Sequence, residues 1–292
     1  MTWLIEPEAL QTELGADNLL ILDCRFDLQN PLAGREQYAA GHIPGALYAH
    51  LDDDLAGPVV SGQTGRHPLP APATWQATLQ RWGVNADTRA VVHDGGNGMF
   101  AARAWWMLRW AGLEDVRVLN GGFQGWLAVN GATSLETPQP AAGSMEVDCP
   151  PDWIVGADDL MTDLSAWRLL DARAWPRYSG ETEPMDPKAG HIPGAVCLDF
   201  GQNVDADGRF LPVTALRKRF AEAGLVTGAD TSSPACSAPE PTPVSYCGSG
   251  VTACHNILAM MLAGLPQPKL YPGSWSEWVT DDRRPVEVSR QS

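Results

Sequence analysis

Short apolar runs alternate with amphipathic stretches along most of this 292-residue chain. One example is the run Ala90–Asp94, which is followed by a helical pattern over Met99–Ala111 and by a second apolar run at Val116–Leu119. Continuous apolar runs of this length are typical of strands buried in a parallel sheet. The pattern predicts an α/β fold with mostly parallel sheets, helices on both faces, and functional residues at the carboxyl ends of strands.

The same order of landmarks occurs twice along the chain. The run Leu19–Arg25 matches Arg168–Arg173, and Gly41–Ala46 matches Gly190–Ala195, with offsets of 148 and 149 residues. A period of this length indicates a duplicated domain, because solenoid repeats are much shorter. Glycine and proline are frequent between positions 130 and 151. We therefore predict domains at 1–132 and 152–292, joined by a linker at 133–151.

One segment of the second half combines a strand, a cysteine and a helix. The strand-like run Pro243–Tyr246 leads into the loop Cys247–Gly250, and a helical pattern follows over Ala253–Ala263. Backbone N–H groups of a glycine-rich loop and the amino terminus of a helix both favour an anion. A thiolate is such an anion, so the pattern predicts that Cys247 is a nucleophile.

The spacing of the cysteines and the net charge exclude several classes of protein. The other five cysteines form no C-x-x-C pair, and the amino terminus has no signal-like pattern, so we expect a cytoplasmic protein with no disulfide framework and no metal site. A formal charge of −15 disfavours nucleic acid and anionic membranes as partners. A proline- and serine-rich stretch at 227–243 predicts a surface loop insertion.

Comparison of the two halves separates structural from chemical residues. His42 and His191 occur in both halves, within His-Ile-Pro-Gly, so we predict a structural turn there. Asp94 stands where the second half has Cys247, and a carboxylate cannot take the place of a thiolate nucleophile. The first domain is therefore predicted to be catalytically silent at its own loop and to lend residues to the second domain's site.

These residues together resemble the rhodanese family of sulfurtransferases in its tandem-domain form. The resemblance rests on the duplicated His-Ile-Pro-Gly-Ala and on the loop Cys247–Thr252. It also rests on two matching segments near the ends of the two halves, Gly121–Trp126 and Gly273–Trp278. It implies two rhodanese-like domains and a Cys247 persulfide that carries sulfane sulfur to cyanide or a thiol acceptor, a thioredoxin-like protein being one such acceptor. The resemblance implies no metal or organic cofactor.

The loop sequence is most similar to that of 3-mercaptopyruvate sulfurtransferases. Gly248 and Ser249 follow the cysteine, where thiosulfate-preferring animal enzymes tend to carry basic residues, so the loop itself holds no cation for a dianion. Donor binding by the loop is assigned to the residues around the cysteine: Gly248, Gly250, Val251 and Thr252. Transfer from thiosulfate at the same site is the alternative.

The resemblance also implies partners for the thiol. Ser249 is matched to a serine that acts with a histidine and an aspartate, whose counterparts are His67 and Asp52; the alternative is a surface histidine and a solvated acidic turn. Arg177 is matched to an arginine that binds the carboxylate of a small anionic donor, or it forms a surface ion pair with Glu181 or Glu183. Met185 stands where the family has a second arginine, which predicts a weaker carboxylate clamp.

Other classes fit less well. A cysteine phosphatase needs an arginine six residues after the nucleophile, and Ala253 stands there. A papain-like protease needs a histidine beside the thiol, and His255 lies along the following helix. A non-catalytic rhodanese-like binding module is opposed by Cys247 itself.

Overall fold

The computed structural model describes residues 2–225 and 241–289, so residues 227–240 of the expected loop insertion lie outside the described residues. The chain forms two compact units. Unit 1 consists of residues 1–58, 69–150 and 204–210, and unit 2 consists of 59–68, 151–203 and 211–292. Unit 1 thus includes residues 204–210, which are flanked in sequence by residues of unit 2. Unit 2 includes residues 59–68, which are flanked by residues of unit 1.

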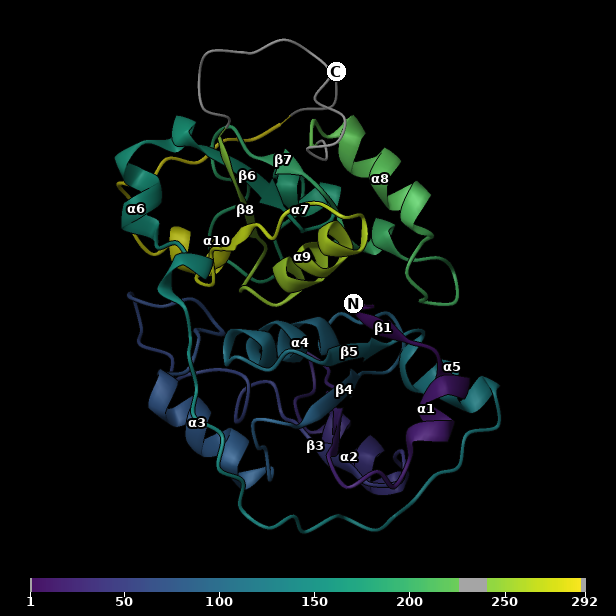
Figure 1. Cartoon of the computed structure of the whole chain (residues 1–292). Coiled ribbons are helices and arrows are strands. Elements are labelled where there is room, and N and C mark those ends of the chain that lie inside the picture. The colour runs from purple at the N-terminus through teal and green to yellow at the C-terminus, as the bar shows by residue number, and fades with distance from the viewer. Residues whose placement is uncertain (1, 226–240, 290–292) are drawn as a thin grey trace. The chain divides into compact units, whose positions relative to one another are not determined.

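Unit 1 is built on a parallel sheet of five strands in the order β1-β5-β4-β2-β3. Of these strands, β1, β3, β4 and β5 are labelled in Figure 1. The bounds are β1 (Leu4–Ile5), β2 (Leu19–Asp23), β3 (Ala46–Tyr48), β4 (Arg89–His93) and β5 (Val116–Leu119). Its helices are α1 (Pro7–Glu13), α2 (Ala33–Ala40), α3 (Pro72–Arg81), α4 (Ala101–Trp110) and α5 (Gly122–Ala128). Strands β2 and β4 are almost entirely buried, as their apolar runs predict.

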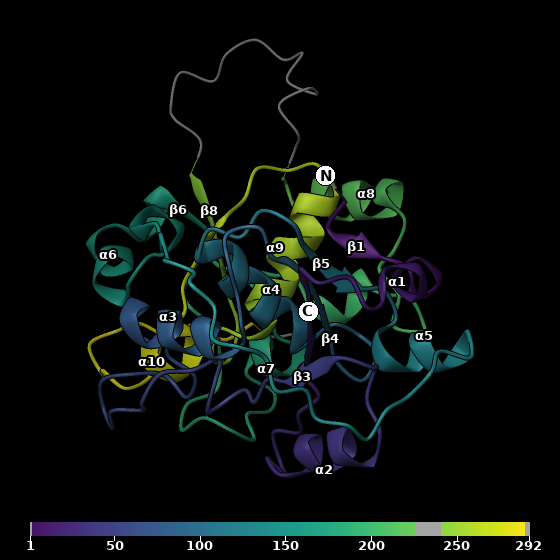
Figure 2. The same ribbon diagram turned by 60° about the horizontal axis from the view of Figure 1, so that its bottom comes forward.

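Unit 2 repeats this plan with four parallel strands in the order β7-β6-β8-β9. Its helices are labelled in Figure 1 and Figure 2. The strands are β6 (Trp167–Asp171), β7 (Val196–Cys197), β8 (Thr242–Tyr246) and β9 (Lys269–Leu270). The helices are α6 (Ala157–Thr162), α7 (Trp175–Ser179), α8 (Val213–Glu222), α9 (Thr252–Leu262) and α10 (Ser274–Trp278), with 3-10 turns at Pro151–Trp153, Leu164–Ala166 and Phe200–Asn203. This order matches β3-β2-β4-β5 of unit 1, so the duplication and the α/β fold class are confirmed.

The duplicated histidines brace each unit in the same way. The His42 ring stacks on Tyr38 with 3.9 Å between ring centroids, and its Nδ1 lies 2.9 Å from the Tyr38 carbonyl oxygen. His191 stacks on Tyr178 at 3.9 Å, with Nδ1 2.8 Å from the Tyr178 carbonyl oxygen. Both imidazoles are buried. The structural interpretation of the His-Ile-Pro-Gly turn is therefore confirmed.

Two further features bear on the sequence predictions. Backbone hydrogen bonds connect the glycine- and proline-rich stretch after residue 130 to unit 1, for example from Ser134 N to His42 O and from Cys149 N to Trp110 O.

Across residues 2–225 and 241–289, no helix has the length and apolar character needed to cross a membrane.

Candidate active site

Strand β8 delivers Cys247 to the loop that precedes α9. The Cys247 side chain is almost fully buried, with 2% exposure, and its Sγ accepts a hydrogen bond from Gly250 N–H at 3.1 Å. Val251 is the N-cap residue of α9, and Thr252 is its first helical residue. The sulfur therefore lies against a backbone donor beside a helix amino terminus, where a negative charge is stabilised.

The loop conformation depends on its glycine and on the start of α10. Gly250 has φ of +79°, and a Cβ there would lie 2.4 Å from the Pro272 carbonyl oxygen. The Cys247 carbonyl accepts from Trp275 N–H and the Gly248 carbonyl from Ser276 N–H, each at 2.9 Å. These contacts hold the loop in one shape, which keeps the Gly250 donor directed at the sulfur.

The segment 59–68, which belongs to unit 2, brings His67 to this loop. His67 Nδ1 lies 2.8 Å from Ser249 Oγ, and the two residues are 6% and 7% exposed. A buried imidazole at this distance can exchange a proton with the hydroxyl. The pairing of Ser249 with His67 is therefore present, and the surface-histidine alternative is wrong.

Asp52 lies in unit 1, in the turn that follows β3. Its backbone N–H donates to His50 Nδ1 at 3.2 Å. Asp52 is exposed to solvent, as the acidic-turn alternative predicts. The part of its carboxyl that the protein shields from water raises its pKa, while the nearby His50 opposes that rise. The participation of Asp52 in the Ser249 and His67 pair stays a prediction.

Arg177, on α7, forms an ion pair and also lies beside the loop. Its Nη2 is 2.7 Å from Glu183 Oε1 and 3.2 Å from Asp186 Oδ2. Its Nη1 is 3.2 Å from the position that a Gly248 Cβ would occupy. The ion pair with Glu183 is thus present, although the Glu183 side chain is buried and does not lie on the surface. Donor binding by Arg177 stays a prediction.

Sequence reasoning missed a second arginine at the loop. Arg66 Nη2 lies 3.0 Å from the Gly248 Cβ position, and its Nη1 forms an ion pair with Asp186. The loop itself holds no cation, as its sequence predicts, but a guanidinium group from a distant segment borders Gly248 in addition to the expected Arg177. The only signal in the sequence was a basic residue directly before His67.

The charges at this site balance one another. A connected ion-pair network joins three guanidinium groups to three carboxylates: Arg66, Arg173, Arg177, Asp171, Glu183 and Asp186. Burial raises the pKa of the Asp186 carboxyl, and the Arg66 charge opposes that rise. A network with no net charge attracts a dianion less strongly than two uncompensated cations would.

The equivalent loop of unit 1 fills its own anion site. The Asp94 carboxylate accepts hydrogen bonds from Gly96 and Gly98 N–H, both at 3.0 Å, through Oδ1. Through Oδ2 it accepts from Phe100 at 2.9 Å and from Ala101 at 3.2 Å. Loops of this type therefore do bind anions with their backbone, and in unit 1 the anion is a fixed carboxylate.

Asp94→Asn should leave sulfur transfer within about twofold of wild type and lower the thermal stability of the protein. An amide accepts fewer hydrogen bonds than a carboxylate and turns N–H toward N–H, so a loss of about 1.5 to 3 kcal/mol is expected. Turnover and a thermal melt measure the two effects, with the exposed Asp17→Asn as the control. A large loss of turnover with an unchanged melt would contradict a silent first loop.

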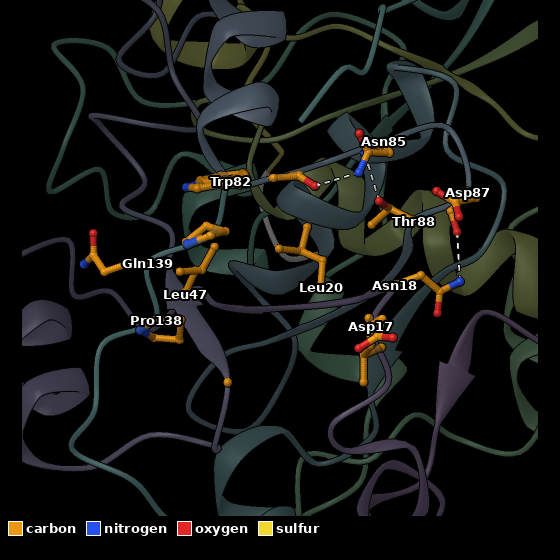
Figure 3. Close-up of a pocket in the computed structure, with 14 residues that line it drawn as sticks. Asp17, Asn18, Leu20, Leu47, Trp82, Asn85, Asp87, Thr88, Pro138 and Gln139 are labelled. Carbon is orange, nitrogen blue, oxygen red and sulfur yellow. Dashed lines mark hydrogen bonds between the residues drawn. The ribbon is translucent and has the colours of Figure 1, made fainter. Parts of the chain in front are cut away.

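Unit 1 also contains a cavity of about 390 Å³ (Figure 3). It lies near the amino-terminal ends of β2 and β4, whereas the Asp94 loop follows the carboxyl end of β4. Asp17, Leu20 and Trp82 are among its lining residues. Among the residues that line it there is no cysteine, histidine, arginine or lysine. It therefore lacks both a thiol that could carry sulfur and a cation for an anionic donor.

The two parallel α/β units form a tandem repeat in which one loop holds a buried cysteine and the equivalent loop holds a carboxylate. The sequence model of the Rhodanese-like domain matches residues 6–129 and 157–281. The chain belongs to the rhodanese family.

Relatives and a solved structure support this assignment. A Pseudomonas aeruginosa protein named "Probable 3-mercaptopyruvate sulfurtransferase" is 47% identical over 286 residues, which is 97% of each chain. The Gallus gallus thiosulfate sulfurtransferase is 30% identical over 93% of this chain and 90% of its own. The crystal structure of an Escherichia coli protein, described as showing the rhodanese fold of 3-mercaptopyruvate enzymes, has a TM-score of 0.78 at 29% identity, covering 95% of this chain and 100% of its own.

Proposed function

We propose that this protein is a sulfurtransferase that moves sulfane sulfur from 3-mercaptopyruvate to cyanide or a thiol through a persulfide on Cys247. The observation that carries the proposal is the Cys247 sulfur at 3.1 Å from Gly250 N–H, in a loop whose Ser249 lies 2.8 Å from His67. The names of the relatives support sulfur transfer, and they include both donors.

The first half-reaction forms the persulfide. The Cys247 thiolate attacks the sulfur of 3-mercaptopyruvate, an S–S bond forms, the donor C–S bond breaks, and the carbon keeps the electron pair as the enolate of pyruvate. The donor loses one thiol proton and the enolate gains one proton, so no net proton is exchanged with solvent. Ser249 and His67 are assigned to this proton transfer. Asp52 is carried over from the family pattern as their third member.

The second half-reaction returns the enzyme to its resting state. Cyanide attacks the outer sulfur, the S–S bond breaks, thiocyanate leaves, and the Cys247 thiolate is restored. A thiol acceptor takes the sulfur in the same way and leaves as a persulfide. The Gly250 N–H can stabilise the charge on sulfur in both states, so no side chain has to change partners between them.

Arg177 is assigned to the donor carboxylate, since its Nη1 borders the Gly248 surface beside the cysteine. The preference for a monoanion over thiosulfate is supported by the balanced charges of the arginine and carboxylate network. The chain as a whole carries a formal charge of −15, which further opposes a dianion.

The donor is tested by steady-state kinetics with cyanide as the common acceptor and thiocyanate as the product measured. We expect a higher kcat/KM with 3-mercaptopyruvate than with thiosulfate. A higher kcat/KM with thiosulfate would make thiosulfate the donor while leaving sulfur transfer intact. An absence of thiocyanate with both donors would instead support a binding module.

A further inference from the structure

Arg66 reaches the Cys247 loop because its own backbone is anchored on α10. The position of a Cβ on Gly65 would lie 2.4 Å from the Gly273 carbonyl oxygen, so the segment 59–68 approaches α10 as closely as a backbone without side chain allows. Arg66 N–H donates to Ser276 Oγ at 3.1 Å, and the adjacent His67 contacts Ser249. The residues on both sides of Arg66, Gly65 and His67, are therefore held in place.

One buried carboxylate holds the two guanidinium groups together. Asp186 Oδ1 pairs with Arg66 Nη1, and Asp186 Oδ2 lies 3.2 Å from Arg177 Nη2. The Asp186 side chain is only 4% exposed, whereas those of Arg66 and Arg177 are 28% and 21% exposed. The buried Asp186 carboxylate thus fixes the distance between the two guanidinium groups, and both arginine side chains remain partly exposed to solvent.

The nitrogens that Asp186 does not use face the cysteine loop. Arg66 Nη2 and Arg177 Nη1 lie 3.0 and 3.2 Å from the Gly248 Cβ position. Among the contacts of residues 2–225 and 241–289, neither nitrogen pairs with a carboxylate, and Arg66 Nε is buried without a partner. Two N–H edges are therefore directed at one small area, next to the residue that follows Cys247.

We propose that Arg66 binds the carboxylate of the α-keto acid donor together with Arg177. This inference rests on the proposed function and names a residue that supplies the second guanidinium of the clamp. Position 185 does not supply it, because Met185 is uncharged and 41% exposed. Two charged donors from different segments match the two oxygens of one carboxylate, and a glycine at 248 leaves the space in which it binds.

The test compares two thiol donors in the wild type and in Arg66→Ala. One donor is 3-mercaptopyruvate, and the other is mercaptoacetone, which has the same ketone and thiol but no carboxylate. The KM for 3-mercaptopyruvate should rise by about tenfold or more, as expected for the loss of a charge-assisted hydrogen bond, with kcat within about threefold. The KM for mercaptoacetone should stay within about twofold. Equal losses with both donors, or an unchanged KM for 3-mercaptopyruvate, would refute the proposal.

Two further variants control for structural damage. Arg283→Ala removes an arginine that is 88% exposed and pairs only locally with Asp281, so its kinetics should match the wild type. Arg66→Lys keeps a charge beside Asp186 but loses the forked geometry, and its KM should lie between those of the wild type and Arg66→Ala. If Arg66→Ala does not fold, the same comparison of the two donors is made with Arg66→Lys.

Pyruvate binding tests the proposal without turnover. Isothermal titration calorimetry should show weaker pyruvate binding to Arg66→Ala than to wild type by about tenfold. Equal affinity would overturn the role of Arg66 in carboxylate binding. Because this measurement needs no sulfur transfer, it decides on Arg66 even if the wild type prefers thiosulfate, so failure of the donor assignment and failure of this proposal are distinguishable.

Discussion

Cys247→Ser should abolish sulfur transfer, with a fall in kcat of at least about 10⁴-fold. A serine hydroxyl can be placed in the same loop, but it cannot form the S–S bond that holds the transferred sulfur. Thiocyanate formation measures the loss. Mass spectrometry of wild type after donor treatment should find one added sulfur atom, about 32 Da, on the peptide that contains Cys247.

The other described cysteines provide the control. Burial raises the pKa of the Cys149 and Cys197 thiols to about 11, and it raises that of Cys24 well above the usual range. These residues are thus protonated near neutral pH and react slowly as nucleophiles. Cys149→Ser, at a half-buried site in unit 1, should retain wild-type turnover. Sulfur found on another cysteine, or substantial turnover by Cys247→Ser, would show that the nucleophile is misassigned.

His67→Ala should lower kcat with 3-mercaptopyruvate by about 10- to 10³-fold, the usual range for acid–base assistance. The reason is that His67 Nδ1, at 2.8 Å from Ser249 Oγ, is the group in position to receive the donor's thiol proton through the hydroxyl. Thiosulfate brings no thiol proton, so its kcat should fall less in the same variant. The ratio of the two effects is the measurement that identifies proton transfer.

A double-mutant cycle extends this test. Ser249→Ala should have a kcat close to that of His67→Ala, and the double variant should be little worse than either single variant, because the two residues act as one unit. Strictly additive losses would mean separate roles. An unaffected His67→Ala enzyme would leave His67 as a buried structural contact of the segment 59–68.

Much of the fold could be predicted because it depends on local patterns. The expected helix over Ala253–Ala263 is observed as Thr252–Leu262, and the expected strand at Ala90–Asp94 is observed as Arg89–His93. Apolar periodicity and glycine stops operate within a few residues, so a single sequence contains the information. The duplication could be read in the same way, since each copy repeats the same local patterns.

The nucleophile and its loop are local as well. Cys247, Gly250 and the start of α9 lie within a few residues of one another, so the sequence alone determined that a thiol would lie in an anion-binding loop. Arg177 and Glu183 are six residues apart, and the sequence predicted their ion pair as one of two alternatives for Arg177. The alignment of Asp94 with Cys247 likewise identified which copy has a carboxylate in its loop, and the catalytic silence of that copy stays a prediction.

Only the tertiary structure decided which distant side chains surround the thiol. Ser249 and His67 are 182 residues apart, and Arg66 and Asp186 are 120 apart. Their contacts exist because the segment 59–68 packs in unit 2 while the chain on either side of it packs in unit 1. No local pattern encodes that path, which depends on the close backbone approach of Gly65 to Gly273. The sequence by itself therefore determined the fold, the repeat and the placement of a cysteine in an anion-binding loop. The position of Arg66 and the ion-pair network around Asp186 follow from long-range packing.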